Sequence, residues 1–204
     1  MNKAKQYVQL VVIILMFAFA SNTWAEHPAE VIVKDAVTIV MEKLTEDKEK
    51  IQEDPQHLLA LVEKYVLPYF DFPKMSSWAL GKYSRKATDK QKAEFTEQFR
   101  LLLVRTYSKA LLEGAGRKVI YLPMRKSNKA NEAVVRTEVE QGSAFPLPID
   151  YKMHTVKDKW KVYDVSIDGI SIVSNYRNTF AKEIRKNGID KLIARLSAKN
   201  IQSK

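Results

Sequence analysis

The sequence predicts an α+β fold with a helical N-terminal half, a four-stranded curved antiparallel sheet and helices at the C-terminus. Apolar residues recur at helical spacing from Pro28 to about Ala115, and after Gly116 the apolar period shortens to two, which is typical of strands. From Ile172 the helical spacing returns. Helices, then consecutive short strands, then helices again are the element order of an α+β domain.

Sequence signals for helix ends support the helical half. Asp54 precedes Pro55, which predicts a helix start, because the acid caps the first free N–H groups and the proline lacks an N–H of its own. Thr88 and Gln91 have the spacing of a capping box and predict the start of a long helix. Gly114 is suited to end that helix.

Four strands are expected at residues 117–126, 133–140, 147–156 and 160–167. In the third, Leu147, Ile149 and Tyr151 alternate with polar or turn-forming residues, which predicts a sheet with one buried face. The connections are short, so neighbouring strands are antiparallel, because a parallel pair needs a long crossover. No repeat or linker divides residues 26–204, and we expect them to form one domain.

The N-terminal 25 residues have the features of a cleavable secretory signal peptide. Lys3 and Lys5 precede an unbroken apolar run of 11 residues from Leu10 to Ala20, and small residues at Thr23 and Ala25 form a cleavage site. This run is shorter than the about 20 residues of a membrane-spanning helix. We therefore expect export and cleavage after about Ala25.

The composition limits the classes of function. The chain has no cysteine, which excludes disulfides, cysteine-based metal sites and a lipid-modified N-terminal cysteine. An exported protein without disulfides suits the periplasm. The net charge is +10, of which the two lysines of the signal peptide contribute +2. Export argues against nucleic acid as a partner and leaves anionic lipid, acidic proteins or a merely solubilising role for the basic surface.

The sequence contains no evident catalytic or metal-binding constellation. His27, His57 and His154 lie in three separate segments without the spacing of metal ligands. There is no G-x-S-x-G elbow, S-x-x-K motif or cysteine nucleophile. Asp164 and Asp168 flank the last expected strand, either as a carboxylate pair or as a hydrogen-bonded acid followed by a turn. We predict no catalytic residue, no metal and no cofactor.

Two stretches of the sequence are similar to a known family. They run from Leu67 to Leu112 and from Lys159 to Leu196, and the most specific part is V-Y-D-x-x-x-x-G-I-S followed by N-Y-R in the second stretch. Together they resemble the MlaC (toluene-tolerance) family of periplasmic phospholipid-binding proteins. The resemblance covers, in order, nearly the whole chain after the signal peptide.

The resemblance implies a carrier rather than an enzyme. In this family the acyl tails of a glycerophospholipid lie in an apolar cavity between sheet and helices, with the head group near solvent. The implied function is to shuttle lipid, as a monomer, between an outer-membrane lipoprotein–porin complex and an inner-membrane ABC transporter complex with an MCE-domain subunit, which maintains outer-membrane lipid asymmetry. Hiding two acyl tails removes a cost on the order of 20 kcal/mol, at about 0.8 kcal/mol per CH₂.

Candidate tail contacts are chosen for apolar bulk on elements that the resemblance places around the lipid. They are Phe99, Leu103, Tyr107, Tyr121, Val135, Val139, Ile149, Tyr151, Val162, Val165 and Ile170. Second-tier candidates are Trp78, Leu80 and Val173. Lys82, Arg85 and Lys86 lie close together in the sequence, and either a bound lipid phosphate or a solvated loop accounts for them.

Two other functions remain open from the sequence. The first is an enzyme with a small pocket, in which an acid such as Asp164 acts on a hydrophobic substrate. The second is a ligand-free assembly factor of the cell envelope. The abundant large apolar side chains suit a filled core as well as a cavity, so they do not separate these functions from a lipid carrier.

Overall fold

The fold joins a helical layer to an antiparallel sheet. The computed structural model describes residues 26–124, 129–142 and 144–202, so the predicted signal peptide lies outside the described residues. The helices are α2 (Pro28–Glu46), α3 (Lys48–Glu53), α4 (Pro55–Tyr65), α5 (Phe72–Leu80), α6 (Asp89–Glu113), α7 (Ile172–Asn187) and α8 (Ile189–Gln202), with 3₁₀ turns η1 (Leu67–Tyr69) and η2 (Gly81–Tyr83). The strands are β1 (Val119–Leu122), β2 (Glu132–Gln141), β3 (Ala144–Val156), β4 (Lys159–Ile167) and β5 (Ile170–Ser171).

The sheet is an antiparallel meander in the order β1-β2-β3-β4-β5. This confirms the predicted architecture, with five strands where the sequence predicted four. The added strand β5 is folded back on β4 by a two-residue turn at Asp168 and Gly169, both at positive φ. A strand of two residues is too short to produce an apolar period, so the sequence pattern did not reveal it.

The predicted helix starts are confirmed by their hydrogen bonds. The Asp54 carboxylate accepts from the Gln56 N–H at 2.9 Å where α4 begins. At the start of α6, the Thr88 N–H donates to Gln91 Oε1 at 3.0 Å and the Gln91 N–H donates to Thr88 Oγ1 at 3.2 Å. These caps satisfy N–H groups that have no partner inside the helix.

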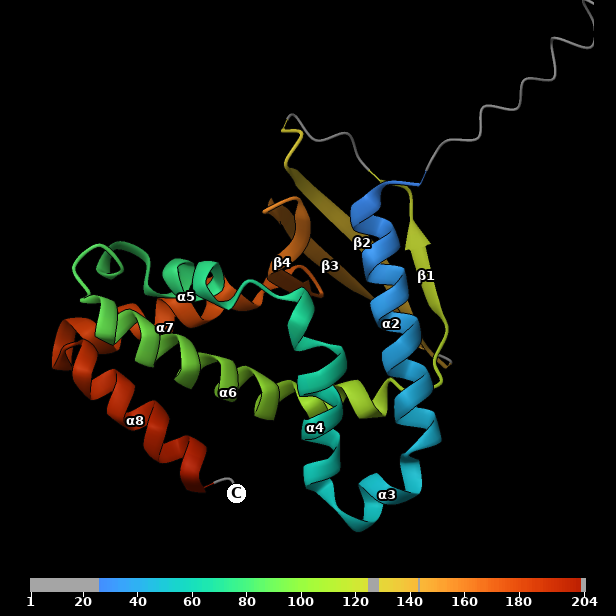
Figure 1. The fold of residues 1–204 in the computed structure, drawn as a ribbon, viewed down its shortest axis with the longest axis horizontal. Coiled ribbons are helices and arrows are strands. Elements are labelled where there is room, and N and C mark those ends of the chain that lie inside the picture. The colour runs from blue at the N-terminus through green and yellow to red at the C-terminus, as the bar shows by residue number, and fades with distance from the viewer. Residues whose placement is uncertain (1–25, 125–128, 143, 203–204) are drawn as a thin grey trace, which may run out of the picture.

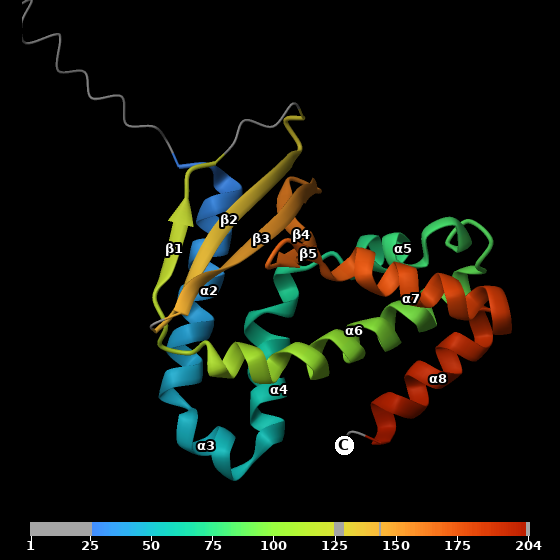
Figure 2. The ribbon, with the colours of Figure 1, turned by 180° about the vertical axis from the view of Figure 1, so that it is seen from behind.

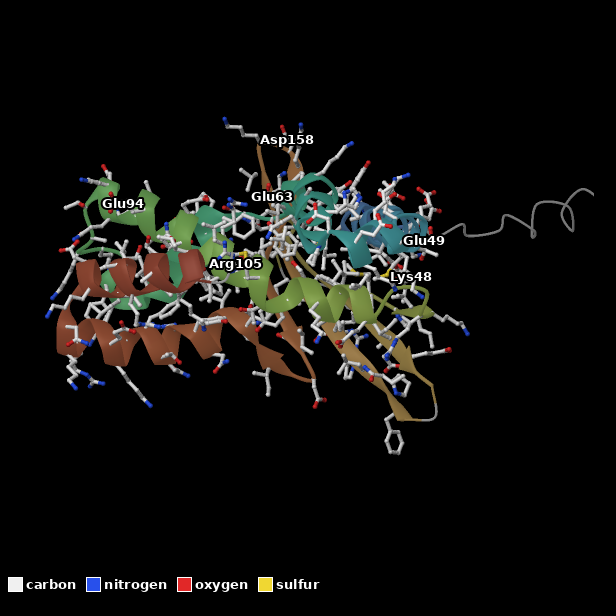
Figure 3. The ribbon with its side chains drawn as sticks, turned by 90° about the horizontal axis from the view of Figure 1, so that it is seen from below. Lys48, Glu49, Glu63, Glu94, Arg105 and Asp158 are labelled. Carbon is white, nitrogen blue, oxygen red and sulfur yellow. The ribbon has the colours of Figure 1, made fainter. Side chains whose placement is uncertain are left out.

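The helices lie over one face of the sheet and beyond its β4 edge. Helix α2 covers one face of β1, β2 and β3, while α5, α6, α7 and α8 form a layer that extends beyond the β4 end of the sheet (Figure 1). From behind, the opposite face of β1, β2 and β3 is in front, with no described helix over it (Figure 2). Charged side chains such as Lys48, Glu49 and Glu94 point outward (Figure 3).

Three groups of buried apolar residues form the core. The helical-layer cluster joins α5, α6, α7 and α8 around Phe95, Phe99 and Phe180. The sheet cluster joins the start of α2 to the inner face of β2, β3 and β4, and the α2–α4 cluster joins the second half of α2 to α3, α4 and α6. Because α6 contributes to the first and third clusters, it connects the helical layer to α2 and α4.

Asp164 fixes the junction between the sheet and α7. Its carboxylate is 1% exposed and accepts from Lys152 Nζ at 3.0 Å, from Ser171 Oγ at 2.7 Å and from the Val173 N–H at 3.2 Å. Ser171 in turn caps α7 by accepting from the Ser174 N–H. Of the two interpretations of this acid, the structure supports the hydrogen-bonded one, because its oxygen atoms are occupied by donors of the fold itself.

A candidate lipid-binding cavity

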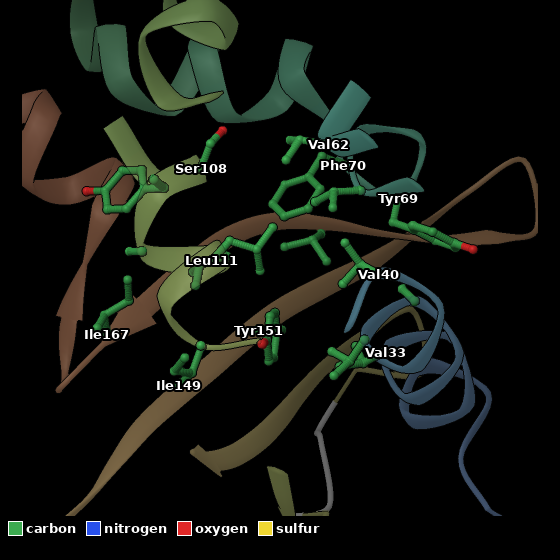
Figure 4. Close-up of a pocket in the computed structure, with 18 of the residues that line it drawn as sticks. Val33, Val40, Val62, Tyr69, Phe70, Ser108, Leu111, Ile149, Tyr151 and Ile167 are labelled. Carbon is green, nitrogen blue, oxygen red and sulfur yellow. The ribbon is translucent and has the colours of Figure 1, made fainter. Parts of the chain in front are cut away.

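A cavity of about 510 Å³ lies where the three clusters meet. It is bounded by the inner face of the sheet, by α2, by α4 and η1, and by the second half of α6 (Figure 4). Its volume falls within the range of about 300–1,000 Å³ that is usual for small-molecule sites. The lining is mainly aliphatic, so the cavity favours an apolar ligand.

Helix α2 forms one wall because its two ends are fixed on different parts of the core. Ala29 near its start is buried in the sheet cluster, and Leu44 near its end is buried in the α2–α4 cluster. Between them, Ala36 and Val37 line the cavity. The start of α2 is also held by an edge-on contact between the His27 and Trp160 rings, whose centroids are 5.2 Å apart.

Tyr151 is a polar side chain within the apolar lining (Figure 4). Burial raises the pKa of Tyr151 to about 12, and a hydrogen bond with Thr137 partly opposes this shift. Thr137 itself donates to the Ile149 carbonyl at 3.0 Å. Ser108, also in the lining, donates to the Val104 carbonyl. The hydroxyls of Thr137 and Ser108 therefore have partners within the protein and do not need a polar ligand.

The charged residues of the lining mark one end of the cavity. Glu113 and Arg117 are exposed, and they flank the point where α6 ends and the chain turns toward β1. Gln141, at the end of β2, is half-buried and also belongs to the lining. The cavity therefore has charged residues where it meets solvent at this end and is mainly apolar along the rest of its length.

Seven of the eleven candidate tail contacts line the cavity. They are Leu103, Tyr107, Val139, Ile149, Tyr151, Val162 and Val165. They come from α6, β2, β3 and β4, and the register of the sheet sets several of them side by side, with Tyr151 opposite Val165. Lining the cavity does not test contact with lipid, which stays a prediction for each of them.

The other four candidates lie elsewhere. Phe99 is fully buried in the helical-layer cluster, and Val135 is 1% exposed in the sheet cluster, so neighbouring side chains fill the space around both. Tyr121 packs at the edge of the sheet cluster, with Lys34 Nζ 5.1 Å from its ring centroid. Ile170 is 64% exposed, because the turn before β5 carries it to the surface.

The second-tier candidates also lie outside the lining. Trp78 is 46% exposed and packs edge-on against the Tyr163 ring, while Leu80 and Val173 are buried in the helical-layer cluster. Sequence reasoning missed the walls from α2, α4, η1 and α5. Their lining residues include Ile32, Val33, Ala36, Val37, Val40, Val62, Val66, Tyr69, Phe70, Phe72 and Met75. On α2 the apolar spacing was a usable signal, but it does not reveal whether the buried face meets side chains or a void.

Asp164, the acid that the sequence analysis offered as an example for an enzyme, does not line the cavity. Asp164 is absent from the lining and is bonded to Lys152, Ser171 and Val173 instead. In residues 26–124, 129–142 and 144–202, no group of three or more His, Cys, Asp or Glu side chains is placed to hold a metal ion. Within the same ranges, no helix has the length and apolarity needed to cross a membrane.

Comparison with known proteins gives consistent matches over most of the chain. The profile of the MlaC family (MlaC protein) matches residues 34–198. The toluene tolerance protein Ttg2D of Pseudomonas putida is 28% identical over 179 residues, 87% of this chain and 83% of that protein. The intermembrane phospholipid transport system binding protein MlaC of Haemophilus influenzae is 24% identical over 195 residues, 94% of this chain and 91% of that protein.

One solved structure provides a comparison in three dimensions. It is the phospholipid-binding protein of Ralstonia solanacearum, in complex with a phospholipid. It is 31% identical, superposes with a TM-score of 0.79, and the match covers 87% of this chain and 99% of that one. The two chains therefore share one fold over nearly all of the solved protein.

Proposed function

The chain belongs to the MlaC family, and on that premise we propose that it is a carrier that holds the acyl tails of a glycerophospholipid in its cavity. The observation that carries this proposal is the apolar cavity of about 510 Å³ between the sheet and the helices. An acyl tail exposed to water costs about 0.8 kcal/mol per CH₂, so a lining of this kind stabilises the bound tails without any chemical step.

The seven candidate residues that line the cavity are the proposed tail contacts, together with the lining residues of α2 such as Ala36 and Val37. We place the head group at the exposed end marked by Glu113 and Arg117, because a phosphate group keeps its hydration there. The aliphatic side chains make no directional bonds, so this cavity selects for apolar length rather than for one particular tail.

The proposed location is the periplasm, and the support for it is the signal-peptide sequence of the N-terminal 25 residues. In this role the carrier exchanges lipid with an outer-membrane lipoprotein–porin complex and an inner-membrane ABC transporter complex with an MCE-domain subunit, and so contributes to lipid asymmetry. Membership of the MlaC family supports these partners.

The lipid content of the native protein tests the proposal. We expect protein purified without detergent and extracted with organic solvent to release phospholipid that mass spectrometry identifies. Protein stripped of lipid should take up labelled phospholipid from liposomes. Protein that carries no lipid as purified and takes up none from liposomes would contradict the proposal, even with the cavity present.

A further inference from the structure

A second hollow lies on the side of α5 that faces away from the lipid cavity. Phe72 and Met75 line the cavity, whereas Ser76 of the same helix lines a cleft of about 560 Å³ between α5, the residues that follow η2 and the first half of α6. This α5–α6 cleft is lined by Ser76, Ser77, Ser84, Arg85, Lys92 and Thr96, among others. Helices α5 and α6 lie side by side in both views (Figures 1 and 2).

The cleft is rich in hydroxyl groups, and one of them lacks a partner. Ser77 Oγ and Ser84 Oγ are hydrogen-bonded to each other at 2.9 Å. Ser76 is 2% exposed, and its Oγ has no hydrogen-bond partner among the residues that the structure describes. A buried hydroxyl without a partner is unfavourable, so Ser76 retains a donor that a ligand oxygen can satisfy.

The cleft also holds a cation without a partner. The Arg85 guanidinium makes no ion pair or hydrogen bond within the described part of the chain, whereas the exposed Lys92 pairs with Asp89 at 3.1 Å. The carboxylate that lines the cleft, Glu97, accepts from Arg100 Nε at 2.9 Å and Nη2 at 2.7 Å, which largely offsets its charge. Arginine presents planar N–H groups that match the oxygen atoms of a phosphate.

The charge around the cleft favours an anion. Residues 72–100 contain 7 Lys and Arg against 3 Asp and Glu, and residues 172–202, which pack beside them, contain 7 against 2. Residues 26–71, which form the α2–α4 side, contain 5 against 11. Such a separation of charge attracts anions toward the helical layer and away from α2.

We propose that the α5–α6 cleft binds a phosphate-type oxyanion, with the Arg85 guanidinium and the Ser76 hydroxyl as donors and Lys92 as the second cation. The same chemical group is present in free phosphate, in soluble phosphate esters and in the head group of an anionic phospholipid. The site is separate from the tail-binding cavity, because α5 stands between them, and it does not depend on the function proposed for that cavity.

Thermal unfolding in phosphate tests the site. We expect sodium phosphate to raise the Tm of the protein above that in sodium chloride at equal ionic strength, and the dependence on concentration gives a Kd. Arg85→Gln should weaken phosphate binding at least ten-fold. The matched control is Lys86→Gln, which removes the same charge from the exposed neighbouring residue outside the cleft and should leave the Kd unchanged. An equal phosphate response in all three proteins overturns the proposal.

Ser76→Ala provides a second readout, since it removes a buried hydroxyl that has no partner. We expect its Tm in chloride to rise and the additional gain from phosphate to shrink. A variant that keeps the full gain from phosphate contradicts the role of Ser76. The phospholipid extracted from Arg85→Gln should equal that of the unmodified protein, so a failure of this site is distinguishable from a failure of the carrier function.

Vesicle sedimentation distinguishes the sources of the phosphate group. Binding to phosphatidylcholine vesicles that contain phosphatidylglycerol, reversed by inorganic phosphate and lost in Arg85→Gln, assigns the site to a lipid head group. Stabilisation by phosphate without vesicle binding assigns it to a soluble phosphate compound. The absence of both effects overturns the site.

Discussion

The two halves of α6 show how one helix serves both a filled core and a cavity. In the first half, Phe95 and Phe99 pack with Phe180 of α7, and the three ring centroids lie 5.5–5.7 Å apart. Tyr176 adds a further ring 5.4 Å from Phe99. In the second half, Leu103 and Tyr107 face the cavity instead.

The difference arises from what lies opposite each half. Aromatic rings packed edge to face fill the space between α6 and α7, whereas the second half of α6 and the sheet residues Val139, Val162 and Val165 line the cavity together. The helical layer is thus filled by side chains, and the space for a ligand remains between α6 and the aliphatic side chains of the sheet. The following predictions test this contrast.

The largest effect should come from truncating a side chain of the filled half. Phe99→Ala leaves a cavity in the helical-layer cluster and should cost about 3–5 kcal/mol of unfolding free energy. Tyr107→Ala, two turns further along α6, should cost less than half as much, because its side chain already borders a void. Urea unfolding of both variants measures the difference, and equal losses would contradict the contrast between the halves.

The second-largest effect should come from enlarging a side chain in the sheet. Val135→Trp overpacks a position that is 1% exposed and should cost about 1–3 kcal/mol. Ile149→Trp places the added bulk in the cavity and should cost less, while it reduces the phospholipid extracted per protein. Urea unfolding compares the stabilities of the two variants, and solvent extraction compares their phospholipid content. Full lipid content in Ile149→Trp would argue that lipid binds elsewhere.

A smaller effect, confined to alkaline pH, should come from Tyr151. Its hydroxyl ionises near pH 10 when the chain is unfolded and near 12 when folded, because burial disfavours the charged form. Between these two pH values the hydroxyl ionises in the unfolded state but not in the folded state. The free energy of unfolding is therefore unaffected by this group below pH 10 and falls as the pH rises toward 12. Tyr151→Phe should reduce this alkaline loss, as measured by the pH dependence of chemical unfolding.

The smallest effect should come from the exposed surface, outside both halves of α6. Hydrogen bonds from Lys50 and His57 lower the pKa of Asp47 to about 2 from 3.8. Its contribution to stability is therefore present above pH 3.8 and is lost as the pH falls through about 2. Asp47→Asn should slightly reduce the loss of unfolding free energy at acid pH, as measured by chemical unfolding at several pH values. It should leave the lipid content unchanged. A change in lipid content would link this surface to the cavity.

Much of the fold could be predicted from the sequence, because the signals are local. The capping box at Thr88 and the Asp54–Pro55 pair set helix starts, and the alternation at Leu147, Ile149 and Tyr151 set one strand. The site could be predicted only in part. The sequence identified apolar positions, but the same pattern describes Phe99, which lies away from the cavity, and Leu103, which belongs to the same cluster and also lines the cavity.

By itself the sequence determined the order of the main helices and of four of the five described strands, together with the family resemblance, since periodicity, caps and motifs are properties of neighbouring residues. The tertiary structure alone decided which buried faces meet side chains and which meet a void. It also turned Asp164 away from the cavity and into bonds with Lys152 and Ser171. The reason is physical: a cavity forms where two packed elements leave a gap, and the width of that gap depends on residues far apart in the chain.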